Sequence, residues 1–224
     1  STDFLAISFS STDYVGHNFG PQSIELEDTY LRLDKDIAEI LTYLDVQYGK
    51  DQVLVFLTAD HAVAEVPGYA NSKKLPGGVF DRNGSISDMK KAINQAFGNV
   101  DLLVGEENSQ LYFNHNLMTK MGIDSKKLFD VVRKSYQKQE GFSELINLQD
   151  IPSANLNAQY TQLIINGYHP ARSGDFMILL KPSWFMGSKT GTTHSTLYSY
   201  DTHVPLLFYG WKVKPSEIVK RTYI

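Results

Sequence analysis

The sequence contains no cysteine among its 224 residues. Disulfide bonds, thiolate metal sites and thiol nucleophiles are therefore excluded together, and a metal ion would have to be held by histidine, carboxylate or hydroxyl groups. The absence suits an exported bacterial protein, but many cytosolic proteins also lack cysteine. The absence of cysteine therefore restricts the possible chemistry of the chain but says little about its cellular location.

The sequence also lacks a basic cluster and a long apolar run. Its 21 Lys and Arg residues and 25 Asp and Glu residues are spread along the chain and give a formal charge of −4. This leaves no basic stripe of the kind that grips a nucleic-acid backbone. No segment approaches the roughly 18 consecutive apolar residues of a membrane helix, and the first residues, STDFLAISFSS, lack the basic start of a signal peptide. We therefore expect neither nucleic acid nor a membrane among the partners.

The length and the 42% hydrophobic content fit one large α/β domain or a core with a sizeable insertion. Both ends are abrupt. FLAISF (4–9) has the composition of a buried strand and starts almost at the first residue, and no capping element follows the last segment. We expect a fragment of a longer protein.

The first part of the chain predicts a strand, a loop, a helix and a second strand. YVGHNFGPQS (14–23) is expected to be a loop, because it contains two glycines and a proline. Apolar residues recur every three or four positions over 24–48, with Ser23 as N-cap and Gly49 as the stop, which predicts a long helix. QVLVFLT (52–58) is typical of a strand covered on both faces in a parallel sheet, and the crossover between such strands is right-handed.

The middle of the chain has the pattern of a separate block. Glycines, prolines and polar residues over 65–86 predict a long surface excursion. Strand-like runs at 176–180 and 204–210 then resume the core pattern, so we expect residues 1–64 and 171–224 to form the core and 65–170 an inserted subdomain. Within the block the sequence predicts a helix capped by Ser87 (87–97), strands at 100–104 and 110–114, and a helix at 125–139.

Chemistry-bearing side chains fall into three loop clusters, each beside an expected core strand. They are Asp13 with His17, Asp60 with His61, and His194 with His203. In open α/β sheets the loops beyond the carboxyl ends of strands form the ligand crevice, and the two aspartates both follow expected strands. We expect the sheet to bring the clusters together.

Each cluster taken alone has two interpretations. The four-residue spacing of Asp13 and His17 suits two ligands on one side of a helical turn, or a capping aspartate and a loop histidine. In TADHA (58–62) two polar groups lie where an apolar strand ends, which suits either a metal or a turn cap. His194 in GTTHST (191–196) has room to reach a ligand, or to bond to neighbouring threonines.

Three segments together resemble the alkaline phosphatase superfamily, most closely the bacterial phosphate-irrepressible alkaline phosphatases near the type I phosphodiesterase and nucleotide pyrophosphatase branch. They are SFSSTDYVGHNFGP (8–21), LTADHA (57–62) and GTTHSTLYSYDTHVPLLFYG (191–210), in the order of the family. The resemblance implies an α/β sandwich of a mostly parallel sheet between helices, with an inserted α+β subdomain. It also implies two zinc ions, one held by Asp13, His17 and His194 and the other by Asp60 and His61. His203 lies in the third segment but matches no ligand, and is expected to support the His194 loop.

The resemblance implies hydrolysis of small phosphate esters, here phosphomonoesters, in the periplasm or outside the cell. In the family a threonine or serine nucleophile and a further aspartate ligand precede the segment where this chain begins, so no nucleophile is assigned here. We expect the chain alone to bind one zinc ion far better than two and to hydrolyse esters hardly at all. The alternatives are a phosphodiesterase or nucleotide pyrophosphatase, a noncatalytic metal-binding domain, and an α/β domain without metal.

Overall fold

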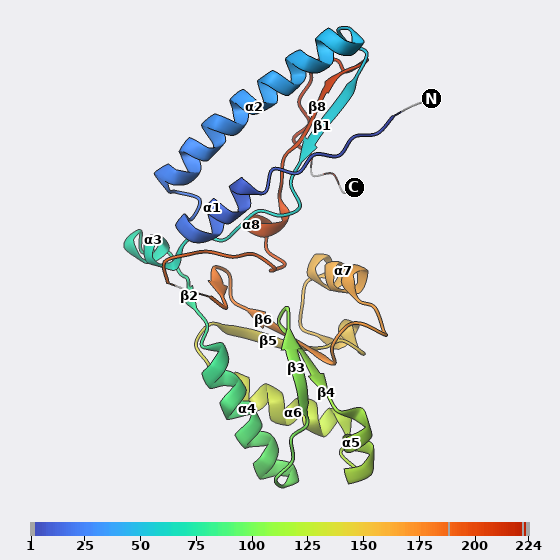
Figure 1. Cartoon of the computed structure of the whole chain (residues 1–224). Coiled ribbons are helices and arrows are strands. Elements are labelled where there is room, and N and C mark those ends of the chain that lie inside the picture. The colour runs from blue at the N-terminus through green and yellow to red at the C-terminus, as the bar shows by residue number, and fades with distance from the viewer. Residues whose placement is uncertain (1–2, 188, 221, 223–224) are drawn as a thin grey trace.

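The computed structural model describes residues 3–187, 189–220 and 222 and has an α/β fold, as expected (Figure 1). One part holds α1, α2, β1, α8 and β8 together with both ends of the chain, and the other holds a four-stranded sheet with α4, α5, α6 and α7 (Figure 1). The elements are α1 (Ser11–Phe19), α2 (Ile24–Tyr48), β1 (Leu54–Thr58), α3 (Pro67–Ser72), β2 (Gly78–Val79), α4 (Arg82–Phe97), β3 (Leu103–Glu107), β4 (Gln110–Phe113), α5 (His115–Met121), α6 (Ser125–Tyr136), β5 (Phe142–Asn147), a 3₁₀ turn (Ile151–Ser153), α7 (Ala158–Gly167), β6 (Phe176–Leu180), β7 (Trp184–Phe185), α8 (Ser199–Thr202) and β8 (Leu206–Gly210). Within the described residues, no helix is both long enough and apolar enough to cross a membrane.

The long helix α2 confirms the prediction made from its caps. The Ser23 hydroxyl accepts a hydrogen bond from the backbone N–H of Leu26 at 3.2 Å. The helix ends at Gly49, whose φ of 93° favours glycine because a side chain would be strained there. Local signals therefore define both ends of this helix.

Helix α1 corrects the expectation of a loop over residues 14–23. Gly16 lies buried inside the helix, where a Cβ would lie 4.0 Å from the Leu26 side chain of α2, an ordinary contact distance, so the helix accepts this glycine without requiring it. The helix ends at Gly20, whose N–H donates to Gly16 O at 2.8 Å. Gly20 therefore marks a helix end, and Gly16 lies within the helix rather than in an irregular loop.

The strand expected at residues 4–9 and the parallel strand unit built on it are not formed. Residues 3–9 have no regular secondary structure, and Phe4 and Leu5 are 80% and 74% exposed. Strand β1 pairs with β8, antiparallel, in a two-stranded ribbon, and its residues are exposed or half-buried. Among the described strand pairs only β2 with β7 is parallel, so the expected parallel neighbours of β1 are not seen here.

The four-stranded sheet of the middle block has the order β3-β4-β6-β5 and antiparallel pairing. Strand β6 is apolar at every position because each of its two faces packs in a different hydrophobic core. Phe176 and Ile178 pack in a cluster with residues of α4 and α6, and Leu179 packs in a second cluster with Ile164 of α7. The strand is buried as predicted, but it joins this sheet rather than β8, so the division at residue 170 stays a prediction.

The helices of the middle block form near their predicted places. Helix α6 ends at Tyr136, three residues early, and α4 begins at Arg82 rather than at Ser87. Its N-cap is Asp81, whose carboxylate accepts from the Gly84 N–H at 2.9 Å. A Cβ at Gly84 would lie 2.1 Å from that carboxylate, so the glycine that suggested a loop is what lets the cap form.

Candidate metal centre

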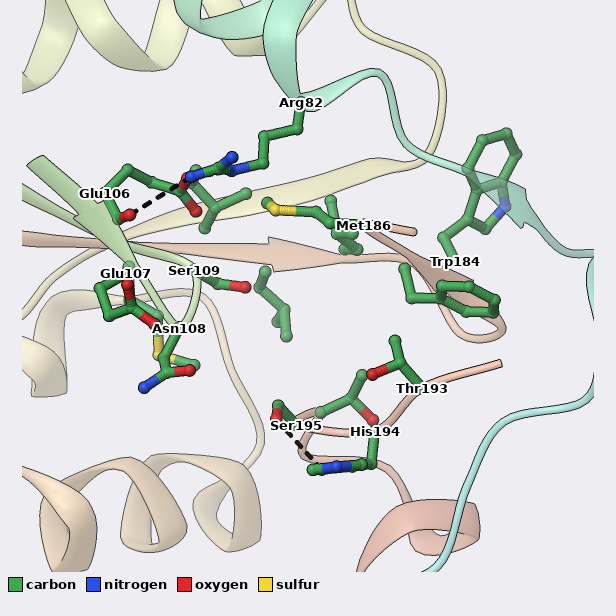
Figure 2. A pocket seen from close by; sticks show the side chains of 16 residues that line it. Arg82, Glu106, Glu107, Asn108, Ser109, Trp184, Met186, Thr193, His194 and Ser195 are labelled. Atoms are coloured by element: carbon green, nitrogen blue, oxygen red, sulfur yellow. Dashed lines mark hydrogen bonds and ion pairs between the residues drawn. The ribbon is translucent and has the colours of Figure 1, made fainter. Parts of the chain in front are cut away.

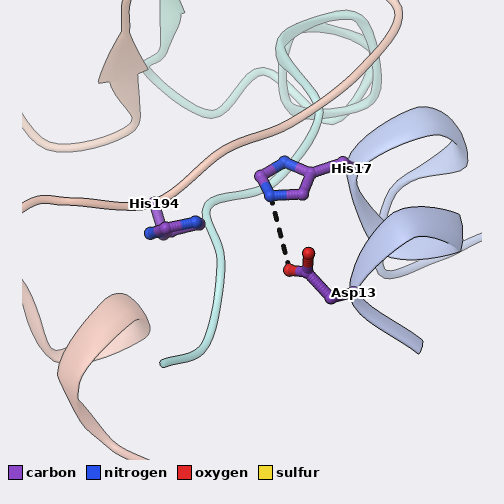
Figure 3. A group of neighbouring side chains, drawn as sticks. All are labelled: Asp13, His17 and His194. Carbon is purple, nitrogen blue, oxygen red and sulfur yellow. Dashed lines mark ion pairs between the residues drawn. The ribbon is translucent and has the colours of Figure 1, made fainter. Parts of the chain in front are cut away.

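Asp13, His17 and His194 come together although they lie at opposite ends of the sequence (Figure 3). One ligand atom from each residue lies within 4.8 Å of the other two. Helix α1 supplies the aspartate and the first histidine, and the segment between β7 and α8 supplies His194. The closure of the fold therefore joins two of the three clusters expected from the sequence.

Helix α1 sets the geometry of the first pair. Because residues four apart share one helix side, His17 Nε2 lies 3.4 Å from Asp13 Oδ1. Nδ1 of His17 lies 2.8 Å from the carbonyl oxygen of Thr192, so the proton belongs on Nδ1 and Nε2 is free to act as a ligand. The Thr192 N–H donates to His17 O at 3.0 Å, and a Cβ at Gly191 would lie 2.6 Å from that oxygen. Glycine is thus needed for the close approach of the two segments.

The Asp60–His61 pair follows β1 and extends the same cluster. His61 Nε2 lies 3.6 Å from Asp13 Oδ1, and the His61 ring is stacked on His194 with centroids 3.4 Å apart. His61 Nδ1 lies 3.1 Å from the carbonyl oxygen of Ala62, so Nε2 is again the ring nitrogen that points toward the cluster. The Asp60 side chain is 90% exposed, and its Oδ2 lies 3.9 Å from His61 Nε2. All five residues expected as ligands are thus neighbours, with Asp60 at the solvent edge.

The surroundings of His194 favour its neutral ring. Burial lowers the pKa of His194, and the nearby His61 and His17 lower it further, while Asp201 and Asp13 act in the opposite direction. A neutral imidazole is the form that binds a metal ion. The cluster is therefore suited to accept a cation without first losing a proton from His194.

Asp201 is a site residue that the sequence did not reveal. It is 3% exposed, its Oδ2 accepts from the Thr196 N–H at 2.7 Å, and its backbone oxygen accepts from the Ala62 N–H at 2.8 Å. Burial raises the pKa of its carboxyl, and within the described residues its Oδ1 has no hydrogen-bond partner. The residue ties the His61 segment to the His194 loop, and its place in the segment 191–210 was the one available signal.

His203, expected to support the His194 loop, is exposed and follows α8. Its backbone N–H donates to Ser199 O at 3.0 Å, and no hydrogen bond of its imidazole is found in the described part of the chain. The supporting role of His203 stays a prediction.

The donor set fits a divalent metal ion of the zinc type. Two imidazole nitrogens and one carboxylate oxygen, with His61 close by, form the ligand combination of three-ligand zinc sites. Calcium and magnesium prefer shells of oxygen ligands, which this cluster does not offer.

Comparison with known proteins gives one family. Residues 1–205 match the family model described as type I phosphodiesterase / nucleotide pyrophosphatase. The chain is 41% identical to alkaline phosphatase PafA of Elizabethkingia meningoseptica and 40% identical to alkaline phosphatase PhoV of Synechococcus elongatus, covering 96% and 100% of this chain and 40% of each relative. It is 39% identical to a protein of Myroides odoratus named calcium-transporting ATPase, over 100% of this chain and 41% of that protein.

A solved structure agrees with these relatives. The chain superimposes on the crystal structure of wild-type alkaline phosphatase PafA with a TM-score of 0.87 and 39% identity, over 94% of this chain and 40% of that one. The chain thus spans about 40% of the length of the relatives that it matches.

Proposed function

Because the chain belongs to the type I phosphodiesterase / nucleotide pyrophosphatase family of the alkaline phosphatase superfamily, we propose that it forms the metal-binding part of a phosphate-ester hydrolase. The observation that carries the proposal is the convergence of Asp13, His17 and His194 within 4.8 Å. Two imidazole nitrogens and a carboxylate oxygen, brought together from the two ends of the sequence, are the donor types of a zinc-like site.

Zinc is the ion that these residues suit, and the two groups of ligands differ in strength. Asp13, His17 and His194 would hold one zinc ion and leave an open position, whereas Asp60 and His61 supply only two ligands to a second. Bound zinc supplies Lewis acidity that stabilises negative charge on the oxygens of a phosphate ester. The name of the Myroides odoratus relative suggests calcium as an alternative ion, but imidazole ligands favour zinc over calcium.

The protein residues orient this chemistry. Thr192 holds His17 through its carbonyl oxygen, and Asp201 holds the His194 loop through the Thr196 N–H. Asp13 Oδ1 lies between His17 and His61, at 3.4 and 3.6 Å from their Nε2 atoms, and joins the two ligand groups. These contacts hold the ligand atoms around one common position before a substrate binds.

Phosphomonoesters are the proposed substrates, because the Elizabethkingia and Synechococcus relatives are named alkaline phosphatases. The description of the family model supports a phosphodiesterase or nucleotide pyrophosphatase as the alternative. We propose a periplasmic or secreted location on the basis of the same relatives. The chain alone is expected to turn over esters hardly at all, because the resemblance assigns no nucleophile among its residues. The Thr192 hydroxyl beside the cluster is buried and donates to Ala64 O, and no role as a nucleophile is assigned to it.

The proposal is tested on the purified, chelator-treated chain by equilibrium dialysis against zinc, magnesium and calcium followed by elemental analysis. We expect retention of about one zinc ion per chain and little of the other two metals. A parallel assay with 4-nitrophenyl phosphate should show little hydrolysis by the zinc-loaded chain. Failure to retain zinc would overturn the metal site, and rapid turnover would overturn the expectation that this chain alone has little activity.

A further inference from the structure

A cleft of about 340 Å³ adjoins the candidate metal centre, between the segment 193–196 and the middle block (Figure 2). The turn between β3 and β4, strand β6 and the segment around β7 form its other walls. His194 belongs both to the lining of the cleft and to the cluster with Asp13 and His17. A molecule in the cleft would therefore lie against a residue of the metal centre. The volume is within the range of small-molecule sites, which commonly occur where two parts of a fold meet.

The walls of the cleft are fixed to each other by hydrogen bonds. The Tyr198 hydroxyl donates to Leu180 O at 2.6 Å, and the Ser183 N–H donates to the Tyr200 hydroxyl at 2.9 Å. These bonds connect the segment that follows His194 to the end of β6 and to the turn before β7. The cleft is thus formed before a ligand binds, and little ordering of the chain is required.

The charges of the lining argue against an anionic group in the cleft. Of the described residues that line it, Arg82, Glu106 and Glu107 are those that carry full charges at neutral pH. Arg82 forms an ion pair with Glu106, whose side chain is 4% exposed (Figure 2). The carboxylate of Glu107 is then left in excess. Glu107 is exposed, so its effect is screened, but the lining offers a phosphate group no unpaired positive charge, and such a group belongs instead at the imidazole cluster.

The remaining lining suits an apolar group. Met177, Trp184 and Met186 are each partly exposed and contribute to the wall. The Trp184 ring packs against Gly78 and Gly141, so it contributes mainly an edge of the wall. The two methionines adapt to irregular shapes, so the wall can take an aromatic ring or a branched alkyl group.

We propose that this cleft binds the alcohol portion of the phosphate ester and prefers a neutral or positively charged aromatic or alkyl alcohol to an anionic one. The proposal rests on the proposed function, since the phosphate group must be held at the metal centre for the alcohol portion to enter the cleft. It assigns the choice of ester to the turn between β3 and β4, to β6 and to the segment around β7.

The test uses two phosphonates, which resemble esters but resist hydrolysis. Benzylphosphonate carries an aromatic group for the cleft, and methylphosphonate does not. The zinc-loaded chain carries Trp211→Phe, so that Trp184, which lines the cleft, is its single tryptophan. We expect benzylphosphonate to bind about tenfold more tightly than methylphosphonate and to change the Trp184 emission. Equal affinities and an unchanged emission would overturn the proposal.

Two variants with a matched control separate the cleft from the metal centre. Met186→Ala should remove most of the benzyl advantage without weakening methylphosphonate, and Met121→Ala, a change of an exposed methionine on α5, should remove none. Glu107→Lys, at an exposed position, should reverse the preference for a 4-aminomethyl over a 4-carboxyl substituent on the benzyl ring. Retention of both preferences in these variants would contradict the proposal.

Failure of the proposed function gives a different result. If zinc fails to bind, or if methylphosphonate binds equally with and without zinc, the metal centre is wrong. The cleft is then tested alone with benzyl alcohol. A saturable change of Trp184 emission that Met186→Ala abolishes would support an apolar site, and no change would overturn it.

Discussion

The imidazole rings of His61 and His194 are stacked, with centroids 3.4 Å apart and planes inclined by 16°. His61 follows β1 and His194 precedes α8, so the stack brings two segments that are far apart in the sequence into contact at the candidate metal centre. Two protonated rings at this separation would repel each other. The stacked arrangement is therefore favoured when His194 is neutral, in line with the lowered pKa of this residue.

This preference predicts a loss of stability in mild acid for the metal-free chain. Burial first, and His61 and His17 next, hold the pKa of His194 below its ordinary value in the folded state. Because the unfolded chain binds the proton more tightly, the stability from neutral His194 is complete above about pH 6.5 and is lost as pH falls below that value. Urea unfolding at about pH 8 and about pH 5.5 measures the difference.

In the variant His194→Gln the free energy of unfolding should depend less on pH than in the unaltered chain. The control His169→Gln, a change in a loop of the middle block, should leave this pH dependence unchanged. The explanation would be wrong if the unaltered chain and His194→Gln lost equal free energy of unfolding over this range.

Asp201 predicts a contrast between two substitutions. Asp201→Ala leaves the Thr196 N–H without its acceptor, which should cost about 1–3 kcal/mol of unfolding free energy. Asp201→Asn keeps an acceptor oxygen and removes the cost of burying a charge, so stability should be equal or higher. Zinc affinity should fall about tenfold or more in the alanine variant only, because the His194 loop loses its anchor. Equal effects of the two substitutions would contradict an anchoring role.

The ribbon of β1 and β8 predicts self-association of the isolated chain. Phe56 and Phe208 are cross-strand partners, 52% and 53% exposed, and exposed apolar strands tend to pair with other chains. Phe56→Lys combined with Phe208→Glu keeps a favourable cross-strand pair and should lower the average mass in sedimentation experiments. Val104→Lys on β3, at a position 69% exposed, is the matched control and should change little. An unaltered chain that is monomeric at high concentration would contradict this prediction.

The features that the sequence predicted depend on local chemistry or on spacing. The caps of α2, Ser23 and Gly49, act within a few residues of themselves. The spacing of Asp13 and His17 needed one helical turn, and α1 provides it. The order of the three ligand segments led to the family, and the structure brings the side chains together.

The features that the sequence did not predict depend on tertiary contacts. Gly16 suggests a loop, but it lies inside α1 and is buried beside Leu26 of α2. The run of β1 suggests burial on both faces, but its one described neighbour is β8. Asp201 and His203 are two residues apart in one motif, and burial alone identifies the aspartate as the residue that contacts the site. Periodicity carries no information on such contacts.

The most direct test of the metal centre is calorimetric titration of the chelator-treated chain with zinc, in the unaltered form and as His17→Ala, His194→Ala and His203→Ala. We predict one tight zinc ion for the unaltered chain. Affinity should fall about a hundredfold or more in the first two variants, since even indirect supports of a ligand are worth about ten- to a hundredfold, and much less in His203→Ala. Undetectable zinc binding by the unaltered chain, or equal affinity in all four proteins, would contradict the account.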